Sequence, residues 1–274
     1  MDVIKINRFN KNYGQVHAVK DLNLSIEQGQ IVGFVGKNGA GKSTTLRCIL
    51  DMIHPTSGKI EVFGLDSVKD SKQIKSMISY IPSEAAFYDS ISCNQLLRFA
   101  ADFNHFPSES IEELAAYFEL DLNKKINELS LGNRKKVSLI QGFLKEAQLM
   151  ILDEPTSGLD PLMQNKFFDL ILKEKEKGKT IFLSSHNLSE IEKYCDQVAI
   201  IKDGELVDFF NMSEVKIQHK QVVHYTTQDE NVTFEINEDI NEVVQKLAKL
   251  TLTSLEIKTK SVEDEFISYY KEDK

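Results

Sequence analysis

One glycine-rich stretch constrains what this chain can fold into more than any other feature. It reads Gly36-Lys37-Asn38-Gly39-Ala40-Gly41-Lys42-Ser43 and matches the pattern G-x-x-x-x-G-K-[ST]. An apolar run at residues 31–35 precedes it directly, and a helical pattern over residues 42–52 follows it. Glycines let the backbone curl so that several N–H groups point inward, and the positive end of the helix dipole adds to their attraction for anions. The sequence therefore predicts a strand, a phosphate-binding loop and a helix in succession.

Lys42 and Ser43 supply the side-chain chemistry of this loop. In such a loop the lysine ammonium holds the β- and γ-phosphates of a nucleotide, and the serine hydroxyl is a ligand of Mg²⁺. The chain contains no Asn-Lys-x-Asp element that would read guanine. We therefore expect a nucleotide and Mg²⁺ at this loop, and a GTPase is disfavoured.

A second motif follows the apolar run at residues 149–152. The carboxylates of Asp153 and Glu154 come directly after this run. Because ligands of open α/β sheets bind at the carboxyl ends of the strands, we expect both side chains near the nucleotide. Asp153 is predicted to hold Mg²⁺ through water, and Glu154 to act as the general base that polarises the attacking water.

Apolar runs and helical patterns alternate through the chain up to residue 205. Residues 3–9 and 19–26 alternate as half-buried strands do, and residues 163–177 have helical periodicity. Residues 59–63 read as a further strand, and continuously apolar runs occur at residues 31–35, 77–81, 149–152, 181–183 and 198–201. Such runs are typical of strands buried on both faces of a mostly parallel sheet. The predicted fold class is α/β, with a P-loop NTPase core.

Two segments depart from this alternation. Between residues 84 and 146, helical patterns at 94–104, 110–120 and 134–145 follow one another without a strand, which predicts a helical subdomain inserted into the core. Beyond residue 205 we expect a small α+β accessory domain, with strands at 215–226, 231–236 and 254–258 and helices at 240–250 and 262–270. The predicted domains are therefore 1–205 and 206–274.

The bulk properties exclude several classes of function. A net charge of −9 leaves no excess positive charge for nucleic acid, and the run Arg134-Lys135-Lys136 is interpreted as the exposed start of a helix. The three cysteines are scattered, which favours free thiols in a reducing compartment over a disulfide or zinc site. No stretch has the ~20 apolar residues of a membrane helix, and no signal peptide is evident, so a cytoplasmic protein is expected.

Over residues 1–205 the chain resembles the ABC-type ATPases. The motifs stand in the order and spacing of that family: Tyr13, the loop at 36–43, Leu129-Ser130-Leu131-Gly132-Asn133, Asp153-Glu154, Ser157-Gly158-Leu159-Asp160 and His186. The resemblance implies that Tyr13 stacks on the adenine ring and that Thr44 binds nucleotide together with the loop. It also implies that His186 hydrogen-bonds the γ-phosphate as a second catalytic residue beside Glu154.

The resemblance further implies a head-to-tail dimer. In that arrangement Ser130, Gly132 and Asn133 reach the γ-phosphate bound to the opposite subunit, and Asp160 links the two sites. The second subunit would be another copy of this chain or a related ATPase. The family also implies a separate transmembrane permease, through which the chain would lie peripherally on the inner face of the cell membrane.

Two positions depart from the family pattern. Leu131 stands where a glycine usually allows close approach to nucleotide, and Ser83 stands where a glutamine usually follows the proline. The shorter Ser83 would not reach Mg²⁺ or the attacking water in the same way. Glu84 is an alternative metal-site residue, although its charge is unfavourable near phosphate unless a metal ion intervenes.

The resulting hypothesis is an ATP-hydrolysing subunit of an ABC transporter that energises export of an unknown substrate, with the permease contact near residues 83–87. Export is suggested by residues 261–270, which resemble the C-terminal ends of ATPases from export-type systems. An amphipathic helix that packs the accessory domain is the alternative for this stretch. Two other classes of function remain: an ABC protein acting on ribosomes or DNA, and a regulatory subunit that binds ATP without hydrolysing it.

Overall fold

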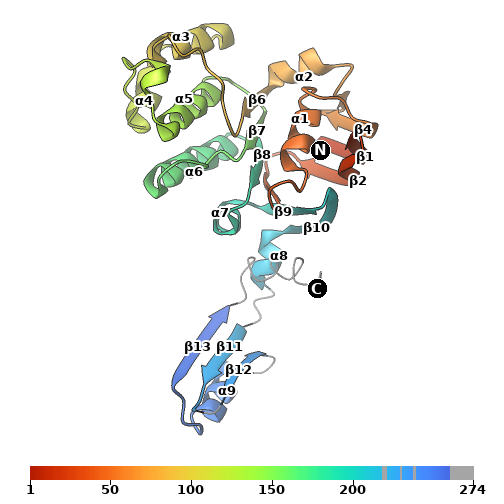
Figure 1. Cartoon of the computed structure of the whole chain (residues 1–274), viewed down its shortest axis with the longest axis vertical. Coiled ribbons are helices and arrows are strands. Elements are labelled where there is room, and N and C mark those ends of the chain that lie inside the picture. The colour runs from red at the N-terminus through yellow and green to blue at the C-terminus, as the bar shows by residue number, and fades with distance from the viewer. Residues whose placement is uncertain (218–220, 229, 237–238, 260–274) are drawn as a thin grey trace. The chain divides into compact units, whose positions relative to one another are not determined.

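The computed structural model describes residues 1–217, 221–228, 230–236 and 239–259. The chain divides into two compact units, Met1–Phe209 and Phe210–Lys274 (Figure 1). The predicted domain boundary at residue 205 coincides with the start of strand β10 (Glu205–Asn211). Because β10 lies beside β9 in the main sheet, the first unit extends past that boundary.

A six-stranded sheet with the order β10-β9-β3-β8-β7-β6 forms the centre of the first unit. Its other strands are β3 (Ile31–Val35), β6 (Ile78–Ile81), β7 (Leu149–Asp153), β8 (Thr180–Ser185) and β9 (Gln197–Lys202). From β9 to β6, neighbouring strands run parallel. Every residue of β3, β7 and β8 is buried, which explains the continuous apolar runs. The predicted α/β class is confirmed.

A smaller antiparallel sheet, in the order β2-β1-β4-β5, belongs to the same unit. Its strands are β1 (Asp2–Tyr13), β2 (Val16–Glu27), β4 (Ser57–Val62) and β5 (Leu65–Asp66). Ile4 and Leu22 from this sheet pack into one core with Phe34 and Phe182 of the main sheet. The two sheets therefore fold as one body.

Four helices connect or flank the strands of these sheets. They are α1 (Lys42–Ile49), α2 (Ser71–Met77), α6 (Pro161–Glu176) and α7 (Leu188–Tyr194). The helix predicted over 42–52 ends earlier, because Asp51 has a positive φ of 48° that stops the helix. Met77, expected at the start of a strand, is instead the last residue of α2.

The predicted helical subdomain consists of elements grouped at one side of the sheet, between β6 and β7 in the chain (Figure 1). These are α3 (Cys93–Asn104), α4 (Glu109–Tyr117), the 3-10 helix η1 (Ile126–Glu128) and α5 (Leu131–Phe143). Ser92 forms a capping box with Gln95 at the start of α3, and the Ser130 hydroxyl caps α5. The interpretation of residues 134–136 as exposed is wrong for Lys135, which is only 6% exposed.

The second unit contains an antiparallel sheet in the order β12-β11-β13. Its elements are α8 (Met212–Ile217), β11 (Gln221–Thr226), β12 (Asn231–Glu235), α9 (Ile240–Leu247) and β13 (Ser254–Thr259). Val243 and Leu247 of α9 pack on Val223 of β11.

One prediction for this second unit is wrong. The strand expected over 215–226 begins only at β11, because residues 212–217 form α8, where the Asn211 side-chain amide donates to Glu214 at 3.0 Å and favours a helical turn. The helix expected over 262–270, and with it the stretch 261–270, lies outside the described residues. Among the helices that the structure describes, none is long and apolar enough to cross a bilayer.

Candidate nucleotide-binding site

The glycine loop connects the end of β3 to the start of α1. Because β8 and β7 follow β3 in the parallel sheet, their carboxyl ends bring further polar residues to the same edge as the loop. Gly39 and Gly41 have φ values of 86° and 109°, and a Cβ atom on Gly41 would lie 2.6 Å from the Ala18 carbonyl oxygen. The loop can therefore follow this path only with glycine at position 41.

The Lys42 side chain lies inside the loop and is 5% exposed. Its ammonium donates to the carbonyl oxygens of Gly36 at 2.6 Å and Lys37 at 3.2 Å. It also lies 3.7 Å from Oε1 of Glu154. Burial lowers the pKa of Lys42, while the neighbouring carboxylates of Glu154 and Asp153 raise it. The loop thus holds a cation at its centre, as the sequence predicts for a phosphate-binding lysine.

Asp153 provides a direct test of whether the site fits Mg²⁺. Its carboxylate is fully buried, and Oδ1 accepts hydrogen bonds from Ser43 at 3.0 Å and Ser184 at 2.7 Å. Within the described part of the chain, Oδ2 has no hydrogen-bond partner. A buried carboxylate oxygen without a donor is costly, so a cation beside Ser43 fits this arrangement. The described residues contain no cluster of three or more His, Cys, Asp or Glu side chains that could hold a metal ion.

Glu154 follows β7 and has a left-handed backbone conformation, with φ of 46°. Its N–H donates to the carbonyl oxygen of Ser184 at 3.2 Å and to the hydroxyl of that residue at 3.0 Å, which holds this unusual conformation. The side chain lies between Lys42, on the Oε1 side, and Nδ1 of His186, 3.2 Å from Oε2. The structure therefore brings both predicted catalytic residues, Glu154 and His186, together at the loop.

The remaining residues predicted to bind nucleotide belong to the loop, to the first turn of α1 or to the end of β1. Lys37, Asn38 and Gly39 form its exposed tip, Ala40 is buried, and Thr44 is half-buried in the first turn of α1. Tyr13 closes β1 with its ring 48% exposed, and the Lys11 ammonium lies 5.0 Å from the ring centroid. An exposed ring of this kind offers a face for stacking.

The signature loop, Ser130 to Asn133, lies at the start of α5. The Ser130 hydroxyl accepts from the Asn133 N–H at 3.4 Å. A Cβ atom on Gly132 would lie 2.9 Å from the carbonyl oxygen of Gly158, so this loop contacts the segment 157–160. Asp160 in that segment caps α6 by accepting from Met163 N–H at 3.0 Å. The Leu131 side chain beside this contact is 73% exposed.

Ser83 and Glu84 follow β6, and a buried cation holds the backbone there. The Lys135 ammonium donates to the carbonyl oxygens of Pro82 at 3.0 Å and Ser83 at 3.1 Å. Burial lowers the pKa of Lys135 to about 8, although the carboxylates of Asp153, Glu154 and Glu84 raise it. Sequence reasoning missed both this lysine and Ser184. The polar pair Ser184-Ser185 at the end of an apolar run was the one available signal for the serine.

This constellation, on the carboxyl edge of a parallel sheet, defines a P-loop nucleoside triphosphatase. Comparisons with known proteins narrow this class. Residues 19–157 match the family described as ABC transporter. The bacitracin transport ATP-binding protein BcrA of Bacillus licheniformis is 36% identical over 233 residues, covering 84% of this chain and 76% of the relative. The ABC transporter ATP-binding protein NatA of Bacillus subtilis is 34% identical over 207 residues, covering 73% of this chain and 84% of the relative.

A solved ATP-binding subunit of an ABC transporter superposes with a TM-score of 0.72 at 28% identity, covering 79% of this chain and 92% of that one. The chain belongs to the family of ABC transporter ATP-binding proteins. It is thus an ATPase and the ATP-binding subunit of an ABC transporter.

Proposed function

We propose that this chain, as one of two facing subunits, hydrolyses ATP with Mg²⁺ and energises export of a substrate through a separate membrane-spanning permease. The observation that carries the hydrolytic part is the position of the Glu154 carboxylate, 3.7 Å from the Lys42 ammonium and 3.2 Å from the His186 imidazole. A carboxylate held beside the phosphate-binding lysine is placed to accept a proton from the attacking water.

Each residue at the loop has one task in this proposal. Mg²⁺, when bound, would neutralise charge on the β- and γ-phosphates. Ser43 and Asp153 would hold it in place, and the Lys42 ammonium would exchange its bonds to loop carbonyls for bonds to phosphate oxygens. Glu154 orients and deprotonates the water, while His186 hydrogen-bonds the γ-phosphate.

The second subunit is proposed to be another copy of this chain, placed head to tail. Ser130, Gly132 and Asn133 then act on the nucleotide of the partner, since the start of α5 offers N–H groups to an anion. The exposed Leu131 beside them supports an outward-facing role for this loop. Asp160, in the contacting segment 157–160, would link the two sites.

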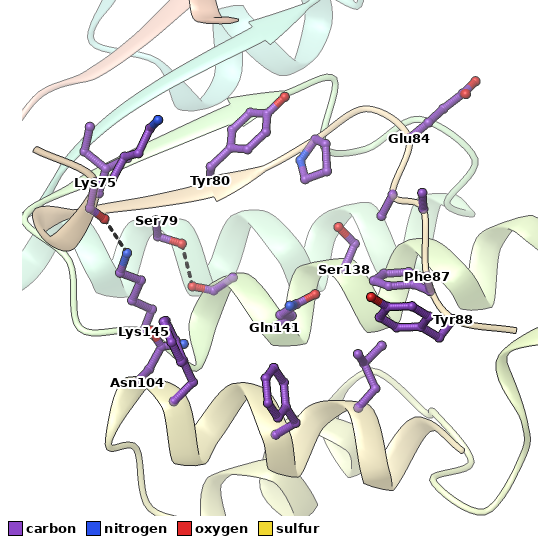
Figure 2. A pocket seen from close by; sticks show the side chains of 18 of the residues that line it. Lys75, Ser79, Tyr80, Glu84, Phe87, Tyr88, Asn104, Ser138, Gln141 and Lys145 are labelled. Atoms are coloured by element: carbon purple, nitrogen blue, oxygen red, sulfur yellow. Dashed lines mark hydrogen bonds between the residues drawn. The ribbon is translucent and has the colours of Figure 1, made fainter. Parts of the chain in front are cut away.

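The permease is proposed to dock in a cavity of about 910 Å³ between the segment after β6 and helices α3 and α5 (Figure 2). The large apolar side chains of Tyr88, Phe99 and Phe103, which line it, are 78%, 70% and 76% exposed. Exposed apolar patches of this kind mark interaction surfaces. In Figure 2, Lys75 and Lys145 lie at one end of the cavity and Tyr88 at the other. Docking here would hold the chain on the inner face of the cell membrane.

The proposed direction of transport is export. It is supported by the resemblance of residues 261–270 to export-type ATPases, and the relatives named for bacitracin transport supply the first substrate to test. The test has two stages. First, the tagged chain is purified from gently solubilised native membranes, and recovery of a multi-spanning membrane protein is expected. Recovery of ribosomal or DNA-associated proteins alone would contradict the transporter role of this chain.

In the second stage, direction is measured in everted membrane vesicles that contain the recovered complex. With bacitracin as the first probe, ATP-dependent accumulation inside the vesicles is expected for export, because the ATPase side faces outward. Vesicles carrying Glu154→Gln provide the control without hydrolysis. ATP-dependent loss of preloaded probe from the everted vesicles would instead show import.

A further inference from the structure

A buried glutamate lies behind the pair Glu154 and His186. Glu190, on α7, is 8% exposed. Its Oε2 accepts a hydrogen bond from the Thr156 hydroxyl at 3.0 Å and another from the Ser185 hydroxyl at 3.4 Å. Thr156 belongs to the loop that starts at Glu154, and Ser185 directly precedes His186. One carboxylate oxygen therefore joins the two loops that carry the catalytic pair.

The cluster around Glu190 is closed to solvent. Thr156 is 6% exposed and Ser185 is 4% exposed. The Ser185 hydroxyl also accepts from the Asn187 N–H at 2.9 Å, so the segment that contains His186 is held on both sides of the histidine. Hydrogen bonds to a buried carboxylate are stronger than those between neutral groups, and such networks restrain the positions of their members.

Stability alone is a weak explanation for a charge in this position. Burial raises the pKa of Glu190, and the hydrogen bonds from Thr156, Ser185 and Asn187 and the proximity of His186 lower it. Burying an ionised group costs free energy that an apolar residue of similar size would not require. What the carboxylate provides, and an apolar residue does not, is a directional link between two separate loops.

We propose that Glu190 is a positioning residue for hydrolysis, which fixes the separation of Glu154 and His186 through Thr156 and Ser185. This inference rests on the proposed roles of Glu154 and His186. The two residues come from adjacent strands, β7 and β8, and their 3.2 Å contact depends on the relative placement of the loops that follow. Small displacements of catalytic groups lower turnover steeply, so the link acts on the rate of the chemical step and not on ATP binding.

The test uses the full-length chain and variants that remove either one donor of the link or its shared acceptor. Thr156→Val keeps the shape of the side chain and removes its hydroxyl, Ser185→Ala removes the second donor, and Glu190→Ala removes the shared acceptor. Each is expected to lower kcat by about ten- to a hundred-fold, with a KM for ATP within about twofold of wild type. Glu190→Gln retains an acceptor oxygen and should keep more activity than Glu190→Ala. Glu192 is a half-buried glutamate on the same helix, and Glu192→Gln is the matched control, which should leave kcat unchanged.

Two outcomes separate this inference from the proposed function. Near wild-type kcat in both Thr156→Val and Glu190→Ala, while Glu154→Gln is inactive, would overturn the role of Glu190 and leave the hydrolytic site intact. Turnover retained in Glu154→Gln would overturn the site itself.

Because Glu190→Ala removes a buried group, its unfolding midpoint is measured as well. A lowered midpoint with normal kcat in the folded protein would reduce Glu190 to a structural residue. If Glu190 acts through the histidine, Glu190→Gln combined with His186→Ala should be no slower than His186→Ala alone.

Discussion

The hydroxyl of Ser184 lies between the two acidic residues of the site: it donates to Oδ1 of Asp153 at 2.7 Å and accepts from the N–H of Glu154 at 3.0 Å. One buried group thus sets the orientation of the metal-site carboxylate and the backbone of the proposed base. The left-handed conformation of Glu154 costs on the order of 1–3 kcal/mol in a residue that is not glycine. The bonds to Ser184 offset part of that cost and keep the carboxylate next to Lys42.

Ser184→Ala should therefore loosen the orientation of the Asp153 carboxylate and the backbone conformation of Glu154 at the same time. We expect the free energy of unfolding to fall by about 1–3 kcal/mol, because the Glu154 N–H loses one of its two acceptors and Asp153 loses a donor. ATPase activity should require more Mg²⁺ for half-maximal rate, since Asp153 is less well oriented. Urea unfolding and an Mg²⁺ titration of ATP hydrolysis measure the two effects. Ser67→Ala, at an equally buried serine outside the site, should leave the Mg²⁺ dependence unchanged.

Glu154→Gln should separate ATP binding from hydrolysis. The amide keeps the size of the side chain but cannot accept the proton from water, so turnover should fall by at least about a hundred-fold. ATP binding should persist, and an ATP-bound dimer should accumulate, which size-exclusion chromatography with ATP and Mg²⁺ would detect. Hydrolysis near the wild-type rate would remove Glu154 from its proposed role.

Lys42→Ala, in contrast to Glu154→Gln, should lose ATP binding. Loss of the only ammonium that the described structure places at the centre of the loop removes the charge that holds the phosphates, so ATP binding itself should be lost. Equilibrium binding of a fluorescent ATP analogue, with Glu154→Gln as the binding-competent control, measures this difference. An unchanged affinity would show that Lys42 does not hold the nucleotide phosphates.

Phe99→Ser and Phe103→Ser test the proposed permease cavity. Both side chains are largely exposed on α3, so their replacement should leave folding and the ATPase rate of the isolated chain within about twofold of wild type. Recovery of the membrane partner in co-purification should fall sharply. Val68→Ser replaces another exposed apolar side chain, outside the cavity, and should recover the partner normally.

Lys135 gives the stability of the protein a predicted dependence on pH. In the folded protein its pKa is lowered to about 8 by burial, against an ordinary value of 10.5. Between these values the unfolded chain binds more protons than the folded one, so stability should rise with pH. Relative to Lys135→Met, the free energy of unfolding of the wild type should increase by up to about 3 kcal/mol from pH 8 to 10.5. Lys42, which is buried, and Lys145, which is half-buried, are present in both proteins and cancel in this comparison. Parallel curves would show that Lys135 keeps its charge.

The strands and the loop were predictable because their signals are local. Residues 31–35 are buried on both faces and read as one apolar run, and the glycines that follow leave few alternative backbones. Lys135 was not predictable, because its carbonyl partner at Ser83 is 52 residues away in the chain and a basic run normally points to solvent. Ser184 and Glu190 were missed for the same reason: a serine at a strand end or a glutamate on a short helix becomes informative only when its neighbours in space are known. The helix α8 was misread because its alternating residues also fit a strand.

Helix α5 connects the signature loop to the proposed permease cavity. Its 13 residues span about 20 Å, from Leu131 at the signature loop to Phe143. Gln141 and Gly142, near the far end, line the proposed permease cavity, and Lys135 clamps the helix to the segment after β6 in between. If docking at the cavity tilted α5, the signature loop at its other end would move as well, with Lys135 as the fixed point between them. The rigid helix would then transmit movement between the membrane partner and the nucleotide site.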